Sequence, residues 1–230
     1  MHCNTCHHEL CATRVPIFSS LDQKQLSFIL SLINRKKYDK GELLLRQGEP
    51  SRNLVIVNQG KVKAFTDTVE GKEQILYIFS PGDFFGEKSL LMDEVASYHI
   101  ETLEQTNVCM IQKEDFQNLI KKDSNIALKV MEELCRRLDK LEKTIETMGT
   151  KSVETRINNV LIEFAQKYGK DHEKGIIIEL PLSREGIANY LGLTRETVSR
   201  KLSLLQEEGI IEMVGNKKVI IKNLHILREM

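Results

Sequence analysis

Four side chains near the C-terminus have the types and the spacing that base recognition requires. They are Arg195, Glu196, Ser199 and Arg200. An arginine can donate two hydrogen bonds to O6 and N7 of guanine, and a glutamate can accept one from N4 of cytosine. Each good pairing of this kind discriminates against a wrong base by about 1–3 kcal/mol. These side chains therefore indicate contacts with the base edges of duplex DNA.

These residues fall on the second helix of a helix-turn-helix predicted over Leu182–Gln206. Ser183 can cap the first helix, and Gly192 supplies the tight turn between the two helices. Thr194 can cap the second helix by accepting a hydrogen bond from a free backbone N–H, and Thr197 lies in its first turn. Apolar residues of the second helix step by four and three, so the base-reading side chains point away from the core. We therefore add Thr194 and Thr197 to the candidate DNA-binding residues.

A hairpin is predicted after the helix-turn-helix. Ile210–Val214 and Lys218–Ile221 have the composition of strands and are joined by a Gly-Asn-Lys turn, in which Gly and Asn can adopt positive φ. A helix over Val153–Tyr168 and a strand over Ile176–Leu180 are expected before the helix-turn-helix. This order of elements is that of a winged helix-turn-helix.

The N-terminal half has the pattern of an all-β domain. Between Leu21 and Phe116, short runs of β-branched and aromatic residues are separated by glycines, which suggests a sandwich or a barrel. The clearest runs are Glu42–Arg46, Leu54–Val57, Val62–Phe65 and Gln74–Phe79.

One long helix is predicted between these two halves, because residues 124–148 contain no Gly or Pro. Its apolar residues alternate in steps of four and three, which is a heptad pattern over three repeats. These residues are Ala127, Met131, Leu134, Leu138, Leu141, Ile145 and Met148. The alternative is an amphipathic helix packed on its own domain, but the strict alternation favours a coiled coil that holds two chains as a homodimer. Cys135 lies beside this seam, and we expect it to be a small packed residue.

Composition limits the other classes of function. The net charge is zero, so a DNA site must be a local basic face and not a basic domain. No apolar run reaches membrane-spanning length, and the N-terminus lacks a basic region followed by an apolar stretch, so we expect a cytoplasmic protein with no membrane partner. A metal-dependent enzyme built on a β-roll usually needs two or three histidine ligands, but between Leu21 and Phe116 the only histidine is His99. Because no phosphate loop, nucleophile elbow or paired-carboxylate motif occurs either, we expect no enzyme activity.

Nearly the whole chain resembles the CRP/FNR family of bacterial transcription regulators. Glu196, Ser199 and Arg200 match the Glu-x-x-Ser-Arg of FNR-type members, and Arg195 matches an arginine that CRP-type members also use. The resemblance implies a palindromic double-stranded DNA target, with half-sites about one helical turn, roughly 34 Å, apart. The half-sites would be similar to TTGAT or TGTGA and their inverse. RNA polymerase is the implied protein partner.

The resemblance also implies an α+β fold. It consists of an N-terminal β-roll like the cyclic-nucleotide-binding jelly roll, a long dimerisation helix and a C-terminal winged helix-turn-helix. The expected divisions are a cysteine-rich sensor segment at residues 1–20, the β-roll at 21–120, the dimerisation helix at 121–149 and the DNA-binding domain at 150–230.

Four cysteines are distributed in a way similar to the cluster ligands of FNR. Cys3, Cys6 and Cys11 form a Cys-x2-Cys-x4-Cys segment, and Cys109 lies far along the chain. In FNR, three clustered N-terminal cysteines and one distant cysteine hold a [4Fe–4S] cluster, which needs four thiolates. The FNR spacing between the second and third cysteines is one residue longer. The resemblance implies that an oxygen-labile cluster at these residues shifts the coiled coil toward a DNA-competent dimer.

Zinc and a thiol switch are the alternatives for these cysteines. Three histidines lie among them, and zinc accepts mixed thiolate and imidazole ligands. Some FNR-like proteins of low-GC bacteria use cysteine pairs as a switch, and a Cys3–Cys6 or Cys11–Cys109 bridge would be the equivalent. A further alternative is a tail without a cofactor, with Cys109 as a buried strand residue.

A cyclic nucleotide is the least favoured signal. CRP-type members bind it with a Gly-Glu turn and an arginine beside a serine that holds the phosphate. Gly86-Glu87 retains the turn, but Ala96 fills the arginine position and no arginine occurs between positions 52 and 136. A cyclic phosphate would lack its bidentate, charge-assisted hydrogen bonds, for which Lys88 could substitute only in part. We therefore expect the Gly86-Glu87 turn to be structural.

Overall fold

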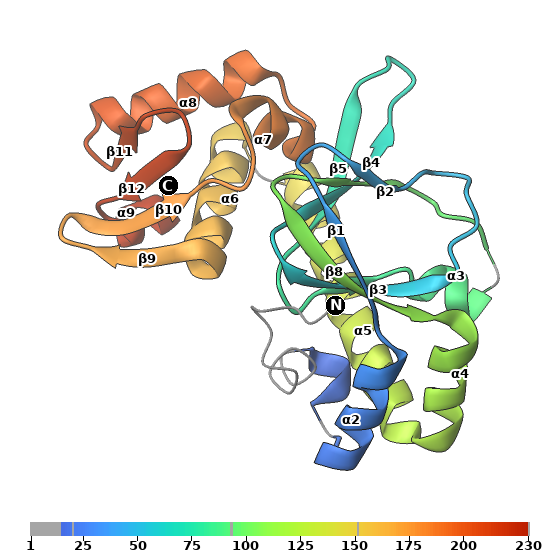
Figure 1. The fold of residues 1–230 in the computed structure, drawn as a ribbon. Helices are drawn as coiled ribbons and strands as arrows, with labels where there is room; N and C mark the ends of the chain where they lie inside the picture. Colours follow the sequence, from blue (N-terminus) through green and yellow to red (C-terminus); the bar gives the residue numbers. More distant parts are fainter. Residues whose placement is uncertain (1–14, 20, 93, 151, 230) are drawn as a thin grey trace. The chain divides into compact units, whose positions relative to one another are not determined.

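The computed structural model describes residues 15–19, 21–92, 94–150 and 152–229 (Figure 1). The chain divides into two units, residues 1–66 with 76–140 and residues 67–75 with 141–230. Three of the predicted cluster ligands, Cys3, Cys6 and Cys11, lie outside the described residues. None of the described helices has the length and hydrophobicity that a bilayer crossing requires.

The first unit is built on a β-roll. Its strands form two antiparallel sheets with the orders β1-β8-β3-β6 and β2-β7-β4-β5. The strands are β1 (Asn34–Tyr38), β2 (Leu43–Leu45), β3 (Asn53–Gln59), β4 (Val62–Asp67), β5 (Glu73–Phe79), β6 (Phe84–Phe85), β7 (His99–Thr102) and β8 (Thr106–Gln112). The four runs predicted as strands correspond to β2, β3, β4 and β5 and are confirmed. The all-β interpretation of the whole region Leu21–Phe116 was wrong in part, because the helices α2 (Gln23–Leu32) and α3 (Glu87–Met92) lie within it.

Strand β3 is apolar on both faces because each face of its sheet is covered. Successive side chains of a strand point to opposite faces. Val55 and Val57 therefore join the core between the two sheets, whereas Leu54 and Ile56 join a second cluster on the outer face.

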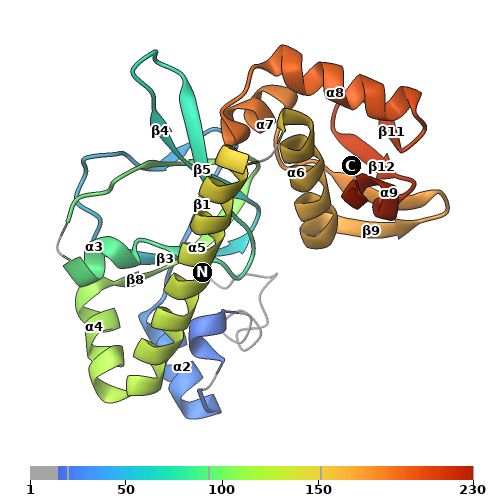
Figure 2. The ribbon, with the colours of Figure 1, turned by 180° about the vertical axis from the view of Figure 1, so that it is seen from behind.

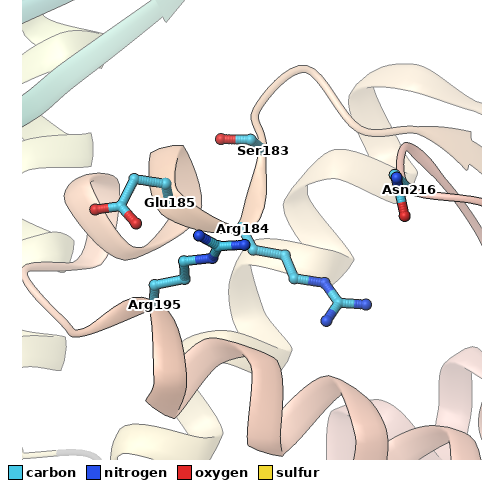
Figure 3. Close-up of a pocket in the computed structure, with 5 residues that line it drawn as sticks. All are labelled: Ser183, Arg184, Glu185, Arg195 and Asn216. Carbon is cyan, nitrogen blue, oxygen red and sulfur yellow. The ribbon is translucent and has the colours of Figure 1, made fainter.

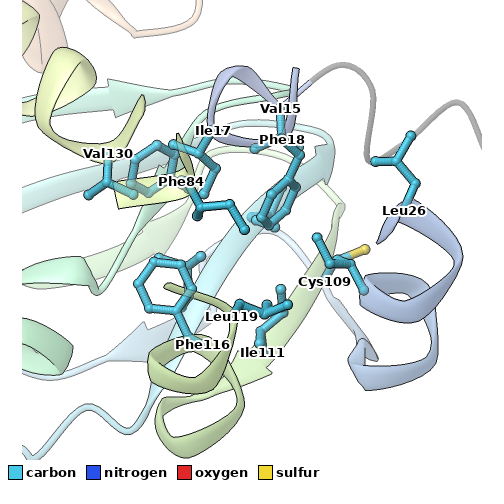
Figure 4. Packing of buried hydrophobic residues seen from close by; sticks show 14 residues of the cluster. Val15, Ile17, Phe18, Leu26, Phe84, Cys109, Ile111, Phe116, Leu119 and Val130 are labelled. Atoms are coloured by element: carbon cyan, nitrogen blue, oxygen red, sulfur yellow. The ribbon is translucent and has the colours of Figure 1, made fainter. Parts of the chain in front are cut away.

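Short helices cover that outer face. They are η1 (Pro16–Phe18), α2 (Gln23–Leu32) and α4 (Lys113–Lys122), together with the start of α5 (Ser124–Thr150). Their apolar side chains meet those of β3, β6 and β8 in one buried cluster (Figure 4). Asp22 and Gln25 form a capping box at the start of α2, and Gln25 Nε2 also donates to Asp123 Oδ2 at 2.9 Å. This bond ties α2 to the residue that precedes α5.

The turn before α3 (Glu87–Met92) requires a glycine. Gly86 has φ of 91°, which L-residues with a side chain rarely adopt. A Cβ atom at this position would also collide with the backbone oxygen of Asn53. The expected structural role of the Gly86-Glu87 turn therefore has a direct steric basis.

Helix α5 is continuous over Ser124–Thr150, in agreement with the long helix predicted from the lack of Gly and Pro. It runs along the roll, as the view from behind shows (Figure 2). Ile126 and Val130 are buried in the outer cluster, so one stripe of the helix packs against its own domain.

The second unit is a winged helix-turn-helix. Its elements are α6 (Val153–Tyr168), β9 (Gly169–His172), β10 (Gly175–Glu179), α7 (Arg184–Leu191), α8 (Arg195–Glu207), β11 (Ile211–Val214), β12 (Lys218–Ile221) and α9 (Leu224–Glu229). The strands form an antiparallel sheet in the order β11-β12-β10-β9. A side chain links the helices, since Arg156 of α6 donates to the backbone oxygen of Leu191 at the end of α7. The predicted α+β fold is confirmed.

Candidate DNA interface and sensor site

Side-chain caps position the two helices of the helix-turn-helix, α7 and α8. Ser183 Oγ accepts a hydrogen bond from the N–H of Gly186 at 3.1 Å, and Thr194 Oγ1 accepts one from the N–H of Thr197 at 3.2 Å. Between them Gly192 ends α7 with φ of 64° in the left-handed region. Both predicted caps and the predicted glycine turn are thus confirmed.

Helix α8 has one buried face and one outward face. Val198, Leu202 and Leu205 are at most 1% exposed, as their steps of four and three predicted. Of the residues predicted to contact bases, Arg195, Glu196 and Arg200 are exposed and Ser199 is half-buried. The Thr194 and Thr197 hydroxyls lie 2.9 Å apart, and Thr194 also serves the helix cap. The structure therefore brings the four predicted base-reading side chains onto one helical surface.

An open groove of about 410 Å³ adjoins this surface. It is lined by Ser183, Arg184, Glu185, Arg195 and Asn216. Figure 3 shows the Arg184 side chain extended toward Asn216, which lies at the tip of the β11–β12 wing. The Arg184 and Arg195 guanidinium groups at the starts of α7 and α8, together with the Asn216 amide at the wing, form a suitable surface for a phosphate.

Sequence reasoning missed Arg184 and Asn216. Arg184 directly follows a predicted N-cap, and Asn216 lies in a predicted wing turn, so both positions were recognisable as surface positions. Their meeting in one groove depends on the packing of the wing beside α7, which no local pattern specifies.

Cys109 lies on the outer face of the β1-β8-β3-β6 sheet. It is 4% exposed and belongs to the cluster that also contains Val15, Ile17 and Phe18 (Figure 4). Its neighbours in register are Arg35 on β1 and Ile56 on β3. The distant cysteine of the predicted ligand set is therefore packed beside the first described residues of the chain. Among the described residues, no group of three or more His, Cys, Asp or Glu side chains is arranged to hold a metal ion.

The Glu87 carboxylate is held by the long helix. Arg137 Nη1 lies 2.7 Å from Glu87 Oε1, and the Glu87 side chain is 6% exposed. Burial raises the pKa of Glu87, and the Arg137 guanidinium opposes that shift. Burial also raises the pKa of the nearby Tyr98 phenol, with the Glu87 charge acting in the same direction. Lys88, which could replace a phosphate-binding arginine only in part, has its Nζ 3.6 Å from Oε2 of Glu94.

The predicted dimer residues lie beside the buried stripe of α5, and only some of them are fully exposed. Met131, Leu138 and Ile145 are 52%, 55% and 70% exposed in the single chain. Leu134 and Leu141 are half-buried, and Leu134 packs partly against the outer cluster. Cys135, expected to be packed, is exposed, because its position on the helix faces the same way as Met131 and Leu138. The helix therefore presents an apolar stripe that its own domain leaves uncovered.

Comparison with known proteins agrees with this architecture. The sequence-family model of the cyclic nucleotide-binding domain matches residues 35–123. The sequence-family model of the Crp-like helix-turn-helix domain matches residues 155–230. The chain is 34% identical to the probable transcriptional regulator flp of Lacticaseibacillus casei, over 93% of this chain and 94% of that protein. It is 28% identical to the fumarate and nitrate reduction regulatory protein of Vibrio cholerae, over 99% of this chain and 89% of that protein.

A solved structure has the same fold. FixK2 from Bradyrhizobium japonicum is similar with a TM-score of 0.77 at 27% identity, over 86% of this chain and 96% of that chain. Fold and site together define a transcriptional regulator with an N-terminal β-roll domain and a C-terminal winged helix-turn-helix. The chain belongs to the CRP/FNR family. Membership implies DNA binding and dimerisation.

Proposed function

We propose that this regulator recognises a two-fold symmetric DNA site with the outward face of α8. The supporting observation is the capped helix with its apolar face buried and Arg195, Glu196 and Arg200 exposed. The N-terminal part of a recognition helix is the part that reaches base edges in the major groove. Ser199 completes the set, and RNA polymerase is the proposed protein partner on the DNA.

Replacing Arg200 with alanine tests this part of the proposal. Loss of a base-directed guanidinium should weaken binding to the preferred site by about 1–3 kcal/mol and relax the preference at one base pair of each half-site. The site is first found by selection from random duplexes, and affinities are then measured at fixed salt. An unchanged sequence preference in the variant would show that the reading face lies elsewhere.

For the sensor, we propose that Cys3, Cys6, Cys11 and Cys109 hold a [4Fe–4S] cluster. Cys109 is buried in an apolar cluster together with Val15. Cys11 precedes Val15 by four residues, so the two Cα atoms are at most about 14 Å apart. Cys109 would add a fourth thiolate to the three of the N-terminal segment, which gives the donor set that such a cluster needs.

The residues around Cys109 would protect and anchor this site. Ile17 and Phe18 are fully or almost fully buried over the same sheet, so they limit the access of water to the thiolate. When bound, the cluster would be held by the four cysteine thiolates and would be sensitive to oxygen. The name of the V. cholerae relative, a fumarate and nitrate reduction regulatory protein, supports an anaerobic role.

Anaerobic purification of the full chain tests the cluster. We expect iron and acid-labile sulfide in equal amounts, with thiolate-to-iron absorption in the visible range. Cys109→Ser should lose both, whereas Cys135→Ser should retain both, because Cys135 is exposed on α5. Zinc without sulfide, or a disulfide found by mass spectrometry in a protein without metal, would contradict the proposal and support the respective alternative.

A further inference from the structure

An ion pair joins α5 to the interior of the roll. Arg137 of α5 and Glu87 of α3 are 50 positions apart in the chain, and their side chains are 15% and 6% exposed. The other Glu87 oxygen, Oε2, is buried and has no hydrogen-bond partner within the described part of the chain. The carboxylate therefore pairs with Arg137 through Oε1 alone.

Several contacts hold the Arg137 guanidinium in one orientation. Nη1 bonds Glu87 at 2.7 Å, and Nη2 donates to the backbone oxygen of Phe84 at 2.6 Å. The guanidinium carbon lies 4.6 Å from the ring centroid of Phe84 and 5.4 Å from that of Phe79. Nε lies 3.6 Å from Glu133 on the same helix. A planar group held by hydrogen bonds and stacking has little freedom to rotate.

The ion pair fixes the rotation of α5 about its own axis as well as one contact between α5 and the roll. Residues Ile126, Val130 and Arg137 follow one another by four and seven positions, so they lie on one stripe of α5 that faces the roll. Leu138 is the next residue and lies about 100° further round the helix. A rotation of α5 that released Arg137 would therefore also turn Leu138 and the rest of the apolar stripe.

Stability alone does not explain such a pair. Removing a carboxylate and a guanidinium from water costs free energy, and apolar replacements of both are often neutral or stabilising. A buried pair of this kind is better suited to specifying one geometry, as polar residues at coiled-coil positions do. Glu87 Oε2, which has no hydrogen-bond partner among the residues that the structure describes, adds to the cost of the pair.

We propose that the Arg137–Glu87 pair is a positioning latch. It sets the rotation of α5 on the roll and so decides which side chains the helix offers to a second copy of the chain. This inference depends on the proposed dimer interface, which is the seam formed by Met131, Leu138 and Ile145. Arg137 and Glu87 act as positioning residues for the seam.

The test compares three variants of the full-length chain. Glu87→Gln removes the charge, and Arg137→Lys keeps a cation but loses the planar, two-site hydrogen bonding. Glu132→Gln is the matched control, because that carboxylate pairs with Lys129 and Arg136 of α5 itself. Dimer dissociation is measured by sedimentation equilibrium, and hydrogen exchange is followed along residues 131–145.

We expect Glu87→Gln and Arg137→Lys to weaken dimerisation at least about tenfold and to speed exchange in α5, since each loses a charged hydrogen bond. Glu132→Gln should change dissociation less than about twofold, as expected for an exposed pair. Exchange in β3 and β8 reports whether the roll stays folded. If Glu87→Gln unfolds the roll, the dissociation constant of the Arg137→Lys dimer alone decides the outcome.

Dimer dissociation within about twofold of the unmodified chain in both latch variants would overturn the proposal. Leu138→Lys separates this failure from failure of the seam. If Leu138→Lys weakens the dimer while the latch variants do not, the seam stands and the latch is refuted. If Leu138→Lys has no effect either, the seam itself is misplaced and the latch is refuted with it.

Discussion

Single arginines in the second unit lie in two different environments. Arg195 and Arg200 are exposed on the outward face of α8, where side chains can reach base edges. Arg184 is half-buried at the start of α7 and lines the groove that extends to Asn216 at the wing. A guanidinium at a helix N-terminus beside an open groove is suited to a backbone phosphate, which positions the protein without specifying sequence.

Replacing Arg184 with alanine should therefore weaken binding to specific and random duplexes to a similar extent. The slope of log affinity against log salt should become shallower by about one, because one phosphate contact is lost. Affinities over a range of salt concentrations measure both effects. Arg228→Ala is the control, since this exposed arginine lies on α9 and does not line the groove. A change of base preference in Arg184→Ala would assign it to base recognition instead.

The helix-turn-helix depends on how its two helices begin and end. Thr194 caps α8 through a hydrogen bond to the N–H of Thr197, at the end of the helix that carries Arg195 and Glu196. Fraying of this first turn would displace the predicted base contacts, although their side chains would be unchanged. The cap therefore contributes to both stability and recognition.

Thr194→Ala should lower the free energy of unfolding of the second unit by about 1 kcal/mol. The loss should be accompanied by weaker specific binding. Ser203→Ala on the exposed face of the same helix is the control and should alter stability by less than about 0.5 kcal/mol. Chemical unfolding followed by circular dichroism gives both values. Equal stabilities of Thr194→Ala and Ser203→Ala would contradict the role of the cap.

Elements were predictable from sequence where the signal is local. The caps at Ser183 and Thr194, the glycine turn and the apolar steps of α8 depend on neighbours within one or two helical turns. Short elements such as β9 and α9 escaped prediction, because four to six residues carry too little periodicity. The Arg137–Glu87 pair was also missed, since nothing in either segment marks a partner 50 positions away.

The same distinction applies to α5. Its heptad pattern was visible in the sequence, but the residues that pack it on the roll, Ile126 and Val130, were not identified. Leu134 contributes to both faces, because it is part of the heptad and also contacts the outer cluster. The predicted alternatives, a dimer helix or a helix packed on its own domain, thus describe two faces of one helix.

Recognition of a whole two-fold symmetric site needs two chains. One reader covers one half-site, and a two-fold symmetric site needs a second reader at a defined spacing. The exposed stripe of Met131, Leu138 and Ile145 is the surface proposed to supply this symmetry. Exposed apolar side chains at heptad spacing are stabilised when a second helix covers them.

Leu138→Lys should weaken self-association at least about tenfold, because it places an ammonium group in the apolar seam. Asp139→Asn, at the neighbouring exposed position, is the control and should leave association unchanged. Sedimentation equilibrium at several concentrations measures both. A Leu138→Lys chain that remains dimeric at the concentration of the unmodified chain would place the interface on another surface.

The proposed cluster couples the cysteines to DNA binding, and operator affinity before and after exposure to air measures this coupling. The full-length chain, purified anaerobically, is titrated with its selected DNA site, and the titration is repeated after air. We predict that air lowers affinity at least about tenfold in the unmodified chain and in Cys135→Ser, whereas Cys109→Ser binds weakly in both conditions. Equal affinity with and without air in the unmodified chain, or an unchanged response in Cys109→Ser, would contradict the account.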